Sequence, residues 1–84
     1  MNNATRKVLI AIFRNPVPRN IEWRELEKLM LSVGAKEIGG SGSRVRFVFN
    51  NCIMLMHRPH PEKEIKPYQV RDARDFFQNA GVLP

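Results

Sequence analysis

The chain has 84 residues, enough for one domain that buries about 60–65% of the surface its unfolded form exposes. Fourteen Lys and Arg residues against eight Asp and Glu residues give a formal charge of +6, which favours a polyanionic partner such as nucleic acid. A single cysteine, Cys52, excludes an internal disulfide and is typical of the reducing cytoplasm. The apolar run at residues 8–13 is too short to span a bilayer, so we expect a cytoplasmic protein without a membrane partner.

A first helix is predicted from the start of the chain to about Arg14. Asn3 or Thr5 can cap its N-terminus, and the two prolines that follow cannot continue it. We expect this helix to form an extension over residues 1–20 that docks on a core over residues 21–84. The docking stripe consists of apolar residues at helical spacing: Val8, Leu9, Ile12 and Phe13.

A second helix is predicted over roughly residues 22–33. Gly34 suits the left-handed conformation that ends many helices. Trp23 is expected to be a packing anchor near the start of this helix, and a short strand over residues 35–38 follows it. The buried stripe of the helix is Leu26, Leu29, Met30 and Val33.

A hairpin forms the centre of the predicted fold. Residues 44–49 alternate basic and apolar side chains, and residues 52–57 run back as a second apolar strand. Asn50 and Asn51 suit a type I′ turn, because asparagine tolerates the positive φ that this turn requires. On the core face, this turn pairs three large apolar residues with three that carry sulfur: Phe49 with Cys52, Phe47 with Met54 and Val45 with Met56.

The opposite face of the hairpin carries the candidate functional residues. The same register places Arg44 across from His57, Arg46 across from Leu55 and Val48 across from Ile53. Directly opposed residues have Cβ atoms about 4.5–5.5 Å apart, so the side chains of Arg44 and His57 can reach one phosphate. The alternative is a solvated arginine face with a histidine at the end of a strand.

A last helix is predicted over residues 67–80, because Pro67 suits a first helical turn and Gly81 suits a C-cap. Its buried stripe is Val70, Ala73, Phe77 and Ala80, and its outward residues are Arg71, Asp72, Arg74 and Asp75. The predicted fold class is α+β, in the order helix, helix, strand, strand, strand, helix. We expect a three-stranded antiparallel sheet with the helices packed on one face, in two layers.

Residues 39–61 contain no Asp or Glu, yet they carry both histidines of the chain, His57 and His60. No Cys-x-x-Cys pair or third histidine accompanies them, so we expect neither a metal nor another cofactor. The remaining chemistry is metal-free cleavage of RNA. His57 is the candidate base, Arg44 and Arg46 are candidates to stabilise the phosphate charge, and His60 is a candidate acid or backbone contact.

Four segments together resemble the HicA family of toxin–antitoxin mRNA interferases: IEWRELEKLMLSVGA, GSGSRVRF, HRPHP and VRDARDFFQNAGV. The resemblance covers about residues 21–82. Residues 7–18 look like the amino-terminal extension of one subgroup of that family.

The resemblance implies a double-stranded-RNA-binding-like fold, mRNA cleavage and a HicB-like antitoxin that covers the active site. The family's catalytic histidine lies in a Gly-Ser-His step, whereas here Gly42 and Ser43 precede Arg44. His57, from the facing strand, is therefore the candidate for that role. The candidate RNA-binding residues are Ser43, Arg44, Arg46 and Arg58.

Two other functions remain open from the sequence. The arginine at position 44 also fits a noncatalytic RNA-binding or regulatory module on the same fold, partnered by an antitoxin-like protein. The apolar residues Val48, Ile53 and Leu55 fit a pure protein-interaction domain, because an apolar surface of this kind favours a protein cover.

Overall fold

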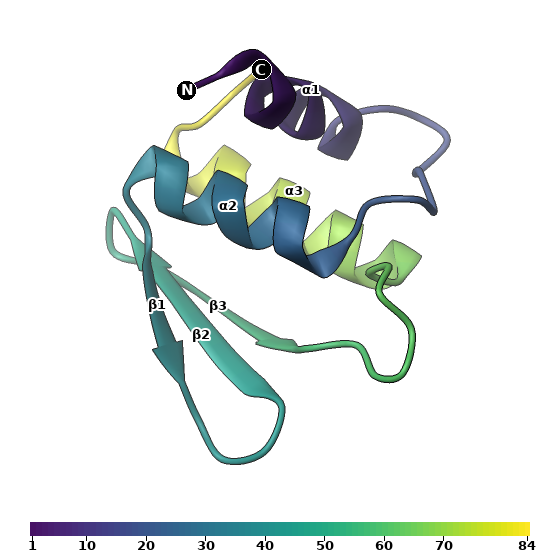
Figure 1. Ribbon diagram of the computed structural model, residues 1–84. Coiled ribbons are helices and arrows are strands. Elements are labelled where there is room, and N and C mark those ends of the chain that lie inside the picture. The colour runs from purple at the N-terminus through teal and green to yellow at the C-terminus, as the bar shows by residue number, and fades with distance from the viewer.

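The computed structural model describes all 84 residues and contains three helices and one sheet (Figure 1). The elements in chain order are α1 (Asn3–Ile12), α2 (Trp23–Val33), β1 (Lys36–Gly39), β2 (Arg44–Phe49), β3 (Cys52–His57) and α3 (Pro67–Ala80). The predicted element order and α+β class are confirmed. None of the three helices combines the length and the apolar character that crossing a membrane requires.

The sheet is antiparallel throughout, in the order β1-β2-β3. Its β2–β3 register is the predicted one, from Arg44 opposite His57 at one end to Phe49 opposite Cys52 at the other. The turn between them has φ values of 49° at Asn50 and 63° at Asn51, as a type I′ turn requires. Below, the helix-side face means the sheet face covered by α2 and α3, and the open face means the other one (Figure 1).

The alternation of side chains along β2 and β3 divides the hairpin between these two faces. The predicted inward residues Val45, Phe47, Met54 and Met56 are all buried. They join the buried residues of the helices in one hydrophobic cluster of 17 residues. The opposite residues Ile53 and Leu55 are 62% and 71% exposed, so the open face has no cover within the chain.

Helix α1 packs across α2 and α3 on the side away from the sheet, so the protein has a third layer beyond the two predicted (Figure 1). Val8, Leu9 and Ile12 of the predicted docking stripe are buried there. The predicted cap was wrong. Asn2 precedes the helix and its Oδ1 accepts a hydrogen bond of 2.8 Å from the backbone N–H of Thr5.

The position of Arg74 on α3 predicted an outward-facing side chain, but the structure shows it bound to the end of α1. Its guanidinium donates to the carbonyl oxygens of Ile12 and Arg14, each at 2.8 Å, and to Oδ1 of Asn15 at 3.2 Å. The last carbonyl groups of a helix have no partner within the helix, and a cation is favourable there. Arg74 therefore fastens the end of α1 to α3, a role that requires the third layer.

Helix α2 ends at Gly34, which has the predicted left-handed conformation with φ of 99°. Trp23, the first residue of α2, packs against Phe47 of β2 with 5.9 Å between ring centroids. The prediction that Trp23 is a packing anchor is confirmed. The tips of the hairpin and of α3 are also joined, because Nδ2 of Asn50 donates a 2.9 Å hydrogen bond to the carbonyl of Ala80.

Candidate active site

His57 is the last residue of β3, and its exposed side chain belongs to the open face. The strand register places it directly opposite Arg44, as predicted. Its Nδ1 atom lies 3.3 Å from Oγ of Ser43, the residue that precedes β2. The three residues at this end of the hairpin thus combine an imidazole, a hydroxyl that orients it and a guanidinium on the neighbouring strand.

The backbone around His57 is held by two further hydrogen bonds. Nε2 of Gln69 donates to the His57 carbonyl at 2.9 Å, and the Arg58 N–H donates to the Ser43 carbonyl at 2.9 Å. Gln69 is only 3% exposed, and its Oε1 accepts a hydrogen bond of 2.9 Å from the backbone N–H of Lys66. The start of α3 is therefore fastened to the end of β3, which fixes the position of the imidazole.

Gln69 was missed by the sequence analysis. The signal that identifies it is its place on the buried stripe of α3, since it precedes Ala73 by four residues and Phe76 by seven. A polar side chain on such a stripe needs a hydrogen-bond partner inside the fold. The His57 carbonyl is that partner.

A cavity of about 490 Å³ lies on the open face at this end of the sheet. Its wall contains the side chains of Arg44, Arg46 and His57, together with the apolar Ile38 and Leu55. The two arginines belong to alternate positions of β2, so both project into solvent. This cavity therefore offers a positive, partly apolar surface beside the imidazole.

The loop between β1 and β2 closes one end of that cavity. Its turn is tight, because the Gly40 N–H donates to the Arg44 carbonyl at 2.9 Å. Gly42 has φ of 65°, a conformation that favours glycine. This turn delivers Ser43 to the position from which its hydroxyl reaches His57.

His60 lies exposed in the loop between β3 and α3. It shares with His57 the lining of a second, smaller cavity of about 150 Å³, to which Lys66 and Tyr68 also contribute. The two predicted catalytic histidines therefore line one cavity. That cavity adjoins the larger one, because His57 belongs to the walls of both.

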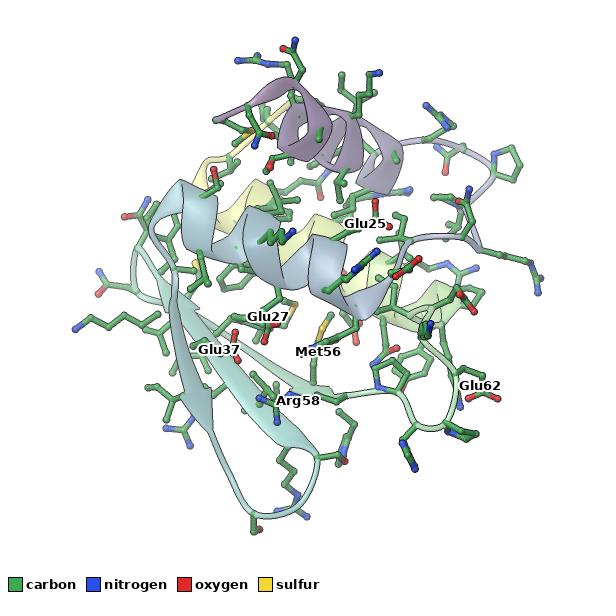
Figure 2. The ribbon with its side chains drawn as sticks, viewed as in Figure 1. Glu25, Glu27, Glu37, Met56, Arg58 and Glu62 are labelled. Atoms are coloured by element: carbon green, nitrogen blue, oxygen red, sulfur yellow. The ribbon has the colours of Figure 1, made fainter.

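Arg58 has a different environment from Arg44 and Arg46. Its Nη2 lies 3.3 Å from Oε2 of Glu37, a β1 residue opposite the buried Phe47 in the sheet register. The sequence analysis missed this ion pair, because the acid comes from outside the acid-free segment. Glu27 of α2 also approaches from the helix layer, so two carboxyl groups and one guanidinium lie between α2 and the sheet (Figure 2).

Burial raises the pKa of Glu37, and the hydrogen bond and negative charge of the Glu27 carboxyl raise it further. The charge and hydrogen bond of Arg58 act in the opposite direction and are outweighed. In the cluster of Glu27, Glu37 and Arg58, the carboxyl group of Glu27 thus opposes the ion pair between Glu37 and Arg58. The cluster lies on the helix side of the sheet, away from the open-face cavity.

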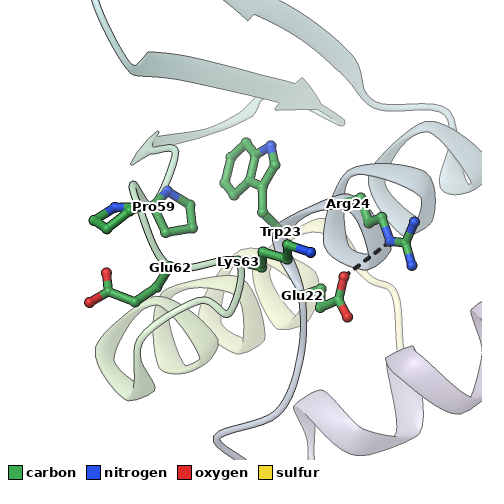
Figure 3. Close-up of a pocket in the computed structure, with 7 residues that line it drawn as sticks. Glu22, Trp23, Arg24, Pro59, Glu62 and Lys63 are labelled. Atoms are coloured by element: carbon green, nitrogen blue, oxygen red, sulfur yellow. Dashed lines mark ion pairs between the residues drawn. The ribbon is translucent and has the colours of Figure 1, made fainter.

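A third cavity, of about 420 Å³, lies where the start of α2 meets the β3–α3 loop (Figure 3). Trp23 contributes to its wall, and the ion pair between Arg24 and Glu22, at 3.1 Å, lies at its edge. The other lining residues are Pro59, Pro61, Glu62 and Lys63. Nε1 of Trp23 is buried without a hydrogen-bond partner.

Cys52 lies at the far end of β3 from His57 and faces the helix side, where its Sγ lies 3.5 Å from the Asn50 carbonyl. No three His, Cys, Asp or Glu side chains are grouped so as to hold a metal ion. The chemistry that the open face offers is proton transfer by an imidazole beside two guanidinium groups.

Comparison with known proteins gives one match. The model of a family described as "HicA toxin of bacterial toxin-antitoxin" matches residues 23–82, from the first residue of α2 to just beyond α3. The match leaves out α1. The search of curated proteins and the search of solved structures gave no match.

Proposed function

Because the chain belongs to the HicA toxin family of bacterial toxin–antitoxin systems, we propose that it is the toxin of a type II system and a metal-independent endoribonuclease that cleaves mRNA and blocks translation. The observation that carries the proposal is the arrangement at the end of the hairpin. His57 projects from the open face, opposite Arg44 and with Nδ1 3.3 Å from the Ser43 hydroxyl.

This arrangement suits a base that takes a proton from the ribose 2′-hydroxyl. When Nδ1–H of His57 donates to Oγ of Ser43, Nε2 carries a free lone pair and can accept that proton. The 2′-oxygen then attacks the neighbouring phosphorus and the bond from phosphorus to the 5′-oxygen breaks. The products are a 2′,3′-cyclic phosphate and a 5′-hydroxyl end.

The arginines and the second histidine stabilise the charges that develop in this step. Arg44 and Arg46 line the cavity beside His57 and stabilise the negative charge that develops on the phosphoryl oxygens. His60, protonated and lining the neighbouring cavity with His57, gives its proton to the departing 5′-oxygen. Ser43 and Gln69 are positioning residues, since they hold the ring and the backbone of His57.

The test is incubation of the purified chain with an mRNA in the presence of a chelator. We expect cleavage that leaves cyclic phosphate ends, and a decrease of about 10²–10⁴-fold in rate for His57→Ala, the usual contribution of a general base. Gln69 binds the backbone carbonyl of His57, so this variant keeps its fold and its thermal unfolding should match that of the wild type. Absence of cleavage, or undiminished cleavage by His57→Ala, would remove this mechanism.

We propose that a HicB-like antitoxin covers the open face. Ile38 and Leu55 are exposed beside the two arginines, and Ile53 is exposed farther along β3, which is a combination suited to a protein cover with acidic groups. The test is co-expression with the product of the adjacent reading frame. Leu55→Asp should prevent co-purification, whereas Leu31→Asp, on the exposed side of α2, should leave it unchanged.

A second function is favoured by one residue, the arginine at position 44. A noncatalytic RNA-binding module on this fold needs the cations of the open face but no base, and Arg44 supplies one of those cations. This function predicts salt-sensitive RNA binding and normal growth on overexpression. Growth arrest that is relieved by His57→Ala would contradict it.

A further inference from the structure

Tyr68 differs from every other aromatic residue of the chain. Phe47, Phe76 and Phe77 belong to the hydrophobic cluster, and Phe13, Trp23 and Phe49 pack against it. Tyr68 does neither, and it is 52% exposed in the first turn of α3. A large aromatic ring that the core does not use is therefore held on the surface.

The ring lies beside the candidate active site. Tyr68 lines the cavity of about 150 Å³ whose wall also contains His57 and His60. This cavity adjoins the one that holds Arg44 and Arg46, because His57 belongs to both. A chain of phosphates that crosses the arginines and passes His57 would next reach Tyr68.

The size and charge of the small cavity fit the base of one nucleotide. Drug-sized ligands occupy roughly 300–1,000 Å³, so a cavity of about 150 Å³ takes only a part of a molecule, such as a single base. Lys66 supplies positive charge to its wall, and Glu62 is its only acid. Proteins that bind single-stranded RNA combine such cations with exposed aromatic rings on which bases stack.

We propose that Tyr68 is a stacking platform for an unpaired base, and that its cavity is the subsite for the nucleotide next to the cleaved phosphate. This inference rests on the proposed function, since it places the subsite beside His57. It makes single-stranded RNA the substrate, because a base within a duplex is already stacked and cannot lie on the ring. Lys66 contacts a phosphate of the same strand.

The position of Tyr68 in the fold allows it to be changed without loss of structure. The ring is half exposed and lies outside the cluster, whereas the neighbouring Gln69 carries the hydrogen bonds that fasten α3 to β3. Tyr68→Ala should therefore fold normally, which thermal unfolding checks. Tyr68→Phe is the matched control, because it keeps the aromatic face and removes only the hydroxyl.

The experiment measures binding of a short single-stranded oligoribonucleotide that carries 2-aminopurine, whose fluorescence falls on stacking. All variants are made in the His57→Ala chain, so that the RNA stays intact whatever the activity of the protein. We expect Tyr68→Ala to weaken binding by about 5- to 150-fold and to abolish the stacking signal, the range that loss of one stacked base gives. Tyr68→Phe should retain both.

Salt dependence separates the ring from the cations. Tyr68→Ala should leave the slope of log affinity against log salt unchanged, whereas Lys66→Ala should reduce it by about 0.7, the value for one phosphate of a single strand. Equal affinity and an equal stacking signal in Tyr68→Ala and its parent would overturn the inference, even if the wild-type chain cleaves RNA. Stacking on Tyr68 without cleavage by the wild type would uphold Tyr68 as a stacking platform, but it would remove the catalytic proposal and with it the placement of the base next to a cleaved phosphate.

Discussion

Two neighbouring residues, His57 and Arg58, show how differently the two faces of the sheet are used. His57 points to the open face, where its ring meets a serine hydroxyl and no acid. Arg58 pairs with Glu37, a partner held between α2 and the sheet. Successive side chains along an extended chain point to opposite faces of the sheet. One residue therefore presents an imidazole to solvent, and the next places a guanidinium in an ion pair on the helix side.

The same division holds for the apolar residues of the hairpin. Phe47 is fully buried under α2, whereas Leu55, which follows the Phe47 partner Met54 on β3, is 71% exposed. The helix-side face thus stabilises the fold, and the open face presents groups that nothing else in the chain uses. Substitutions on the first face should change stability, and those on the second should change binding or cleavage alone.

The largest expected effect is that of Phe47→Ala. Deletion of a fully buried phenyl ring lowers the free energy of unfolding by about 3–5 kcal/mol. That is a large part of the total unfolding free energy of a small domain. Leu55→Ala is the control on the open face, where surface substitutions usually change stability by less than about 0.5 kcal/mol. Denaturant unfolding of both variants measures the contrast. Comparable losses would mean that the two faces are not used differently.

The hairpin was predictable because its two signals are local. The Asn50-Asn51 turn fixes the register, and the period-two alternation then decides which side chains are buried. Helix α3 was predicted with its observed bounds for a similar reason, since Pro67 and Gly81 mark its ends. In each case the information lies within a few residues of the element.

The contacts that the sequence did not reveal join distant segments. Arg74 binds carbonyl groups about sixty residues earlier in the chain, and Arg58 reaches back to Glu37. The residue pattern of a single helix or strand cannot predict these contacts. They depend on how α1 packs on α3 and how β1 pairs in the sheet. For the site, the opposition of Arg44 and His57 followed from register, but the support by Ser43 and Gln69 followed from loop and helix packing.

A smaller effect is expected from a pair of arginine substitutions. Arg58→Ala removes the cation that offsets two close carboxyl groups, and its partly exposed ion pair limits the loss to about 0.5–1 kcal/mol of unfolding free energy. Arg46→Ala removes an exposed open-face side chain and should leave stability unchanged while it weakens RNA binding. Denaturant unfolding and RNA titration of both variants test this. The reverse pattern would place Arg58, rather than Arg46, in the RNA-binding surface.

The smallest expected effect is a change in how stability depends on pH. The pKa of Glu37 is raised above its ordinary value of 4.5, chiefly by burial and then by Glu27. The folded state therefore holds this proton more tightly than the unfolded state does. The resulting stabilisation is fully present below about pH 4.5 and is lost as the pH rises through the raised pKa.

Glu37→Gln tests that dependence, because the amide keeps the shape of the side chain and cannot ionise. The unfolding free energy of the wild type, relative to this variant, should fall as the pH rises from 4 toward 7. Glu62→Gln, an exposed acid in the β3–α3 loop, controls for the loss of a surface charge. A difference between wild type and Glu37→Gln that grows with pH would show that Arg58 outweighs burial and Glu27, and the helix-side cluster would then be a simple ion pair.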